Sequence, residues 1–217
     1  MRFIGIIGSH KEESYNRKLL EFARLIMVDQ MKIDLFDLTE IPIFNPDLDI
    51  NSFVKLLEIA KAIEASDGVI IASPEINYTI PSKLKSLIEW LSYDIHPFIN
   101  KPVMLMGAST GPDATIRAQA HLRDILIAPG LEAIVMPASD FLLANAAEKF
   151  DEDGRLIDEQ TEDFLEHCLL RFEMFCQKLQ GLDYSNILSK YSLTIEVGGY
   201  INLDDPESDA ISGPSEY

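Results

Sequence analysis

The stretch "RFIGIIGSHKEESYNRKLLEFARLI" (residues 2–26) contains one strand, one polar loop and the start of one helix. Its residues 3–7 are an apolar run without polar alternation, which is typical of a strand buried on both faces. Beyond residue 16, leucine, phenylalanine and isoleucine recur three and four residues apart, which predicts a helix over 16–30. The loop between them, "GSHKEESYN" (8–16), therefore places many small hydrogen-bonding residues at a helix start.

The same alternation of strand and helix continues along the chain. Further strand-like runs lie at 32–37, 68–73, 102–107 and 132–137, and further helical patterns lie at 52–66, 82–93, 113–128 and 158–181. Repeated strand–helix units predict an α/β fold, in which a parallel sheet has helices on both faces. We expect a three-layer sandwich with a five-stranded sheet in the order 2-1-3-4-5.

Composition limits the classes of partner. The 217 residues are 47% hydrophobic and carry a formal net charge of −18, so the chain has a full core and disfavours nucleic acid and anionic membranes as partners. The acids are concentrated in two places: residues 148–166 hold nine acids and two bases, and the last 37 residues hold seven acids and one base. We expect one domain over 1–181 and an acidic C-terminal extension over 182–217, partly disordered by its composition.

Targeting and metal signals are missing from the sequence. The first apolar run is too short for a secretory leader, and no stretch approaches the roughly 20 apolar residues of a membrane span. Cys168 and Cys176 lie eight residues apart in a helical pattern, which predicts two buried thiols rather than a disulfide or a metal site. We therefore expect a cytoplasmic protein without a metal.

The two most polar loops follow the first and third strands. In the order 2-1-3-4-5 the strand order reverses between these two strands, and ligands of open α/β sheets bind at such a point. The loops are 8–16 and "SPEINYTIP" (73–81). Unpaired N–H groups at the helix start, with Ser9, Ser14, Asn16 and Lys11, would hold a phosphate.

A simpler alternative is that Ser14 or Asn16 only caps the helix. Neither the glycine pattern of dinucleotide-binding folds nor that of a P-loop is present, so a mononucleotide with a terminal phosphate fits better than a dinucleotide.

Both loops carry motifs of a known family. Gly8, Ser9, Ser14 and Asn16 match G-S-x-R-x-x-S-x-N, with Lys11 in place of the arginine. The segment "PEINYTIPSKLKSLIEWL" (74–91) matches P-E-Y-N-x-S-I-P-x-x-L-K-x-x-I-D-W-L. Over residues 1–180 the chain resembles the NADPH-dependent FMN reductase family, which contains flavodoxin-like quinone, azo-dye and chromate reductases.

The resemblance implies an FMN-dependent oxidoreductase. Bound FMN would pass a hydride from NADPH or NADH to a small-molecule acceptor such as a quinone, an azo compound, a metal oxyanion or free flavin, with no catalytic acid or base from the protein. The implied cofactor-binding residues are Ser9, Lys11, Ser14, Tyr15 and Asn16 at the phosphate, Pro74, Glu75, Ile76, Asn77 and Tyr78 at the ribityl chain and ring, and Ser109, Thr110 and Gly111 as a third wall.

Several points stay open at the level of sequence. Ile76 and Thr79 replace the family's tyrosine and serine, which affects substrate specificity more than flavin binding. The resemblance implies a homodimer or homotetramer, and Trp90 is either a packing residue or part of an interface beside Tyr93. The rival functions are a non-enzymatic flavin-binding electron carrier or redox sensor, and a cofactor-free scaffold whose acidic extension recruits a basic partner.

Overall fold

The computed structural model describes residues 1–137 and 140–180, of which Met1–Leu179 pack as one unit. The extension predicted for 182–217 lies outside the described residues. In the described part of the chain, no helix has the length and apolar character needed to cross a membrane.

The described unit alternates strands and helices as predicted. In chain order its main elements are β1 (Arg2–Ile7), α1 (Tyr15–Ile26), β2 (Lys32–Phe36), α2 (Val54–Glu64), β3 (Gly68–Ala72), α3 (Ser82–Tyr93), β4 (Pro102–Ala108), α4 (Ile116–Leu126), β5 (Ile134–Val135), β6 (Phe141–Leu143) and α5 (Glu159–Leu179), with two short 3₁₀ helices at Ile50–Ser52 and Ala146–Glu148. The strand order β2-β1-β3-β4-β5 confirms the predicted topology. The pairing of Ile7 with Ala72 brings the ends of β1 and β3 level, so their two loops leave the sheet side by side.

The sheet has a sixth strand that the sequence did not predict. A single strand was expected over 132–137, but β5 ends at Val135 and β6 continues the same edge, both pairing in parallel with β4. Pro137 lies between the two pieces and has no backbone N–H to donate to a ladder. The edge strand is therefore split, and the prediction of five strands was one too few.

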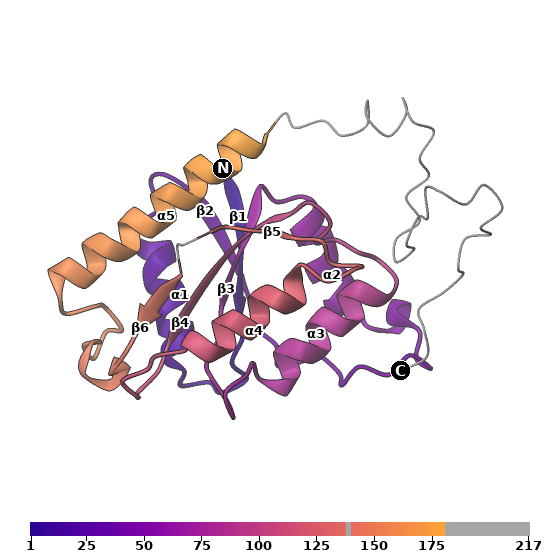
Figure 1. The fold of residues 1–217 in the computed structure, drawn as a ribbon, viewed down its shortest axis with the longest axis horizontal. Coiled ribbons are helices and arrows are strands. Elements are labelled where there is room, and N and C mark those ends of the chain that lie inside the picture. The colour runs from indigo at the N-terminus through magenta and orange to yellow at the C-terminus, as the bar shows by residue number, and fades with distance from the viewer. Residues whose placement is uncertain (138–139, 181–217) are drawn as a thin grey trace, which may run out of the picture. The chain divides into compact units, whose positions relative to one another are not determined.

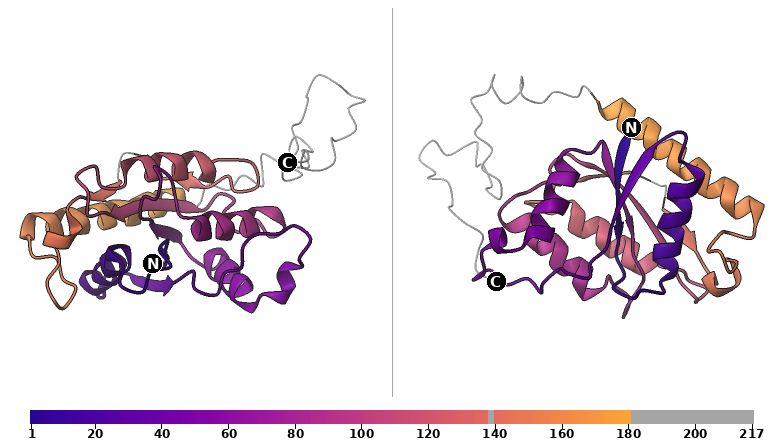
Figure 2. Two further views of the ribbon diagram at one scale, coloured as in Figure 1. Left: turned by 90° about the horizontal axis from the view of Figure 1, so that it is seen from below. Right: turned by 180° about the vertical axis from the view of Figure 1, so that it is seen from behind.

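Helices cover both faces of the sheet (Figures 1 and 2). One core lies under α1 and α5, and the other lies under α2, α3 and α4. Cys168 and Cys176 are each 1% exposed in the first core, as predicted. Burial raises the pKa of the Cys176 thiol to about 12, so this thiol stays protonated and unreactive at neutral pH.

Helix α3 binds the loop that follows β2 through a row of polar groups. Lys83 Nζ donates to the carbonyl of Ile41, and Trp90 Nε1 donates to the carbonyl of Pro42 at 3.1 Å. Trp90 is 1% exposed, so the packing alternative for this residue is confirmed and the interface alternative was wrong. Tyr93, by contrast, is 46% exposed at the end of the helix.

Candidate functional site

A cavity of about 420 Å³ lies at the carboxyl ends of β1, β3 and β4. This volume falls within the range of roughly 300–1,000 Å³ that is usual for ligand sites. The predicted residues that line it are Ser9, Lys11, Ser14, Tyr15, Asn16, Pro74, Glu75, Ile76, Ser109 and Thr110. Sequence reasoning missed the other lining residues, which are His10, Glu13, Pro81 and Ala108.

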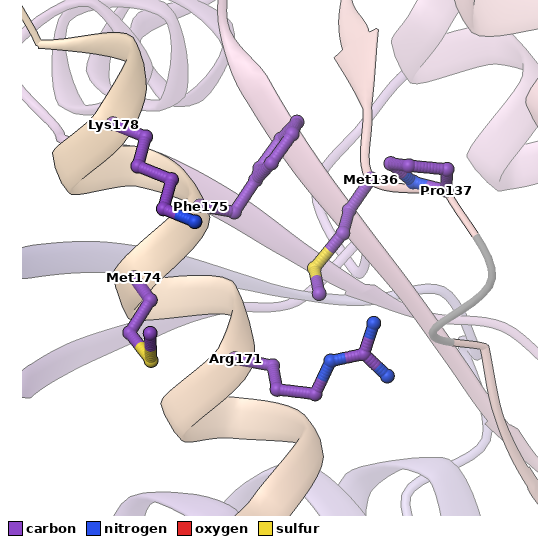
Figure 3. A pocket seen from close by; sticks show the side chains of 6 residues that line it. All are labelled: Met136, Pro137, Arg171, Met174, Phe175 and Lys178. Carbon is purple, nitrogen blue, oxygen red and sulfur yellow. The ribbon is translucent and has the colours of Figure 1, made fainter.

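A second, smaller cavity of about 190 Å³ lies between α5 and the residues that follow β5 (Figure 3). Its lining is Met136, Pro137, Arg171, Met174, Phe175 and Lys178. None of these residues belongs to the two polar loops. The larger cavity is therefore the candidate site.

Close packing of the backbone brings the walls of the larger cavity together. A Cβ at Gly8 would lie 2.8 Å from the carbonyl oxygen of Ala72, and a Cβ at Gly107 would lie 2.1 Å from Thr115 Oγ1. Glycine is needed at both positions because neither neighbour leaves room for a side chain. The loop after β1 thus begins in direct contact with the end of β3.

Ser14 caps helix α1. Its backbone is extended, and its Oγ accepts a hydrogen bond from the N–H of Asn16 at 3.2 Å. The structure therefore confirms that Ser14 caps the helix, but not that capping is its only role. Capping does not exclude phosphate binding, because the hydroxyl keeps its own hydrogen for a second bond.

Three serines of the cavity share this arrangement. Ser9 Oγ accepts from the N–H of Lys11 at 3.2 Å, and Ser109 Oγ accepts from the N–H of Gly111 at 3.1 Å. In each case the chain fixes the hydroxyl oxygen while the O–H hydrogen remains able to donate. The cavity therefore gains oriented hydroxyl donors from two loops without fixed positive charge.

Asn16 connects two walls of the cavity. It is 2% exposed, its Nδ2 donates to the carbonyl of Ala108 at 2.9 Å, and its Oδ1 accepts from the N–H of Ala108 at 2.9 Å. The side chain thus fixes the start of α1 against the end of β4. Its contribution in this structure is to hold the 8–16 loop in place, and any contact with a phosphate is additional to that.

A tight turn forms the tip of the loop after β3. Ile76 and Thr79 exchange two backbone hydrogen bonds, of 2.9 and 3.0 Å, while Asn77 and Tyr78 have φ angles of 51° and 65°. Such a pair of positive φ angles is the geometry of a two-residue hairpin turn. Ile76 lines the cavity, whereas Asn77, Tyr78 and Gly111 are not among the described lining residues.

Glu75 holds the loop after β3 against α4. Its Oε2 accepts from the backbone N–H groups of Arg117 at 2.9 Å and Ala118 at 3.1 Å, so it caps a helix 42 residues away in sequence. Its Oε1 lies 3.3 Å from Arg117 Nη1. The carboxylate is therefore a structural group in this state, and no local sequence pattern pointed to the contact.

Replacing Glu75 by alanine is expected to destabilise the protein by about 1 kcal/mol, because the first turn of α4 loses its cap. Urea unfolding of the flavin-free protein would measure the change. Glu75→Gln keeps an acceptor oxygen and should lose less. Equal stability of Glu75→Ala and the parent protein would show that the cap contributes nothing.

Comparisons with known proteins identify the family of the chain. A family model described as NADPH-dependent FMN reductase matches residues 1–148. The chain is 37% identical to an NADH:(hydroxy)cinnamate reductase subunit of Vibrio ruber, over 84% of this chain and 90% of that protein. It is 32% identical to a quinone reductase of Escherichia coli K12, over 83% of this chain and 97% of that protein.

A solved structure extends the likeness to three dimensions. The flavoenzyme NAD(P)H:(acceptor) oxidoreductase FerB from Paracoccus denitrificans superposes with a TM-score of 0.74 at 26% identity, covering 82% of this chain and 97% of that one. The fold, the matched segment and the relatives above 30% identity lead to the same conclusion. The chain belongs to the NADPH-dependent FMN reductase family and is an FMN-dependent NAD(P)H oxidoreductase.

Proposed function

We propose that the larger cavity holds FMN, with the phosphate in the loop 8–16 and the flavin ring between the loops 74–78 and 109–111. The observation that carries the proposal is the convergence of fixed serine hydroxyls and the start of α1 on one cavity. A helix start favours an anion through its unpaired N–H groups and its dipole.

The cavity suits a phosphate that is held mainly by neutral donors. Ser9 and Ser14 are 8% and 6% exposed, so their hydroxyls are ordered before any ligand arrives. Among the described lining residues, Lys11 is the one side chain with a fixed positive charge, and Glu13 lies two residues beyond it. Hydrogen bonds to hydroxyl and backbone groups would therefore supply most of the binding.

The side chains of this protein bind and orient rather than react. FMN supplies hydride chemistry when it is bound. Pro74 and Pro81 form rigid, apolar parts of the wall, and Ile76, which is 51% exposed, adds an apolar edge at the opening. We assign no catalytic acid or base, and we propose that the open cavity admits the nicotinamide nucleotide and the electron acceptor in turn.

The acceptor is proposed to be a small molecule. Relatives are named for quinones, for flavin and for (hydroxy)cinnamate. Their names also include both NADH and NADPH as donors. For this chain the proposed acceptor is a quinone, an azo compound, a metal oxyanion or free flavin.

Steady-state kinetics test the shared cavity. If NAD(P)H and acceptor occupy the same opening in turn, double-reciprocal plots at several acceptor concentrations should be parallel, as in ping-pong exchange. Intersecting lines would indicate that both bind together and would contradict a shared opening. Tight FMN binding with negligible turnover would instead favour the electron carrier or redox sensor.

We also propose that the chain forms a homodimer or homotetramer. Large apolar side chains are exposed on and beside α3, among them Ile43 at 63%, Val54 at 69% and Tyr93 at 46%. Phe44, next to Ile43, lies with its ring centroid 5.5 Å from that of Tyr93, so these side chains share one region of the surface. A monomer in light scattering at micromolar concentration would refute self-association.

The cytoplasmic location expected from the sequence stays a prediction.

A further inference from the structure

An arginine beside the cavity is already neutralised. Arg117 lies 3.3 Å from Glu75, which lines the cavity, and 3.2 Å from Asp113. Its guanidinium also lies 4.4 Å from the ring centroid of Tyr78, on which it stacks. Hydrogen bonds to Asp113 and Glu75 raise the pKa of Arg117, as expected for a cation held by two carboxylates. An incoming anion would compete with these two carboxylates for the arginine.

A second source of negative charge lies beside the part of the cavity wall that contains Tyr15 and Ser109. The segment 148–159, here called the acid loop, contains six acids and two bases. Phe150 of this loop stacks on Tyr15 of the cavity, with ring centroids 5.9 Å apart. Just before the loop, the N–H of Ala146 donates to the carbonyl of Ser109 at 2.9 Å. The acid loop is therefore fixed beside two cavity-lining residues.

The cations beside the cavity do not offset these acids. Lys18, whose Nζ lies 5.8 Å from the ring centroid of Tyr15, adds one positive charge against the net −4 of the acid loop. The described lining residues include one ammonium group, that of Lys11, and two carboxylates, those of Glu13 and Glu75. If Lys11 serves the FMN phosphate, as the proposed function assumes, no cation of the lining remains for another anion. A cleft lined by one sign of charge lowers the local concentration of ligands with the same sign.

Glu75, Asp113 and the acid loop are together called the acidic mouth of the cavity. We propose that the acidic mouth makes the enzyme select NADH over NADPH and an uncharged or cationic acceptor over an anionic one. NADPH differs from NADH by one phosphate on the adenosine ribose, which adds about −1.5 to −2 charges near pH 7. The inference rests on the proposed function, because it concerns the entry of substrates to the same cavity. It identifies Asp113 and the acid loop as specificity-determining parts outside the lining.

Ionic strength gives the first test. At 0.01 M salt, where screening extends over about 30 Å, kcat/KM of the FMN-loaded enzyme should be at least ~10-fold higher for NADH than for NADPH. The ratio should fall as salt reaches 0.15 M, where the screening length is about 8 Å. An uncharged quinone should likewise be used better than its sulfonated, anionic derivative at low salt. Equal use of the two nucleotides at low salt would overturn the inference.

Matched variants separate the effect of the acidic mouth on nucleotide preference from the effect of the net charge of the whole protein. Asp113→Asn removes one carboxylate from Arg117, and the double variant Glu152→Gln/Asp153→Asn removes two exposed acids from the acid loop. Both should raise kcat/KM for NADPH several-fold and that for NADH less. The control is Asp29→Asn/Glu64→Gln, which removes two exposed acids near the amino ends of β2 and β3, whereas the cavity lies at the carboxyl ends of the strands.

The control should leave the NADPH/NADH ratio unchanged. If the control variant changes the NADPH/NADH ratio of kcat/KM as much as the mouth variants do, the preference comes from the net charge of the protein. That result would overturn the proposed role of the acidic mouth. Failure of the protein to bind FMN or to oxidise either nucleotide would instead refute the proposed function.

Discussion

Ser14→Asp is expected to weaken FMN binding about 30-fold while the flavin-free fold keeps its stability. Aspartate is as good a helix cap as serine, so the bond to the N–H of Asn16 can be retained. The new carboxylate would, however, face the phosphate that we place at the start of α1. At ~4 Å and an effective dielectric constant of about 20, each pair of unit charges repels by roughly 4 kcal/mol. Screening and side-chain movement reduce this to about 2 kcal/mol, which is about 30-fold in affinity.

The experiment titrates FMN into the apo form of the variant and records its Tm without flavin. Ser14→Ala is the control, because it removes the cap, at about 1 kcal/mol of stability, without adding charge. A stable Ser14→Asp fold with the affinity of the parent protein would leave Ser14 as a cap alone.

Asn16→Leu is expected to lower the free energy of unfolding by about 2–6 kcal/mol. Leucine has a similar size, but it leaves the N–H and the carbonyl of Ala108 without the two bonds that Asn16 makes. Each buried group left unpaired costs about 1–3 kcal/mol. Because the same bonds fix the loop 8–16 against β4, FMN affinity should fall as well.

Urea unfolding of the flavin-free protein measures this loss, with Ser14→Ala as the comparison two residues earlier. If Asn16→Leu were no less stable than Ser14→Ala, the connection between α1 and β4 would be weaker than its two buried hydrogen bonds indicate.

Local patterns were enough to predict the order of the elements and much of the candidate site. The period of apolar residues predicted the bounds of α3 correctly, and the alternation of strands and helices predicted a parallel sheet. Polar composition at two strand ends identified the loops that line the cavity. These features are read over a few neighbouring residues, so they are visible in a single sequence.

The contacts that hold the site together could not be predicted in this way. Asn16 pairs with Ala108 across 92 residues, and Glu75 caps a helix 42 residues away. Both side chains bind backbone groups, which every residue has. The sequence around the partner residues therefore carries no pattern that marks these contacts. Similarly, β6 has three residues and forms only where β4 offers a free edge, so its own sequence carries little signal.

Comparing FMN with riboflavin tests the phosphate site most directly. The two ligands share the flavin ring and ribityl chain and differ by the phosphate that we place in the loop 8–16. Titrating each into the flavin-free protein under identical conditions should show tight binding of FMN and much weaker binding of riboflavin. Equal affinity for the two ligands would contradict the assignment of this loop as the phosphate anchor.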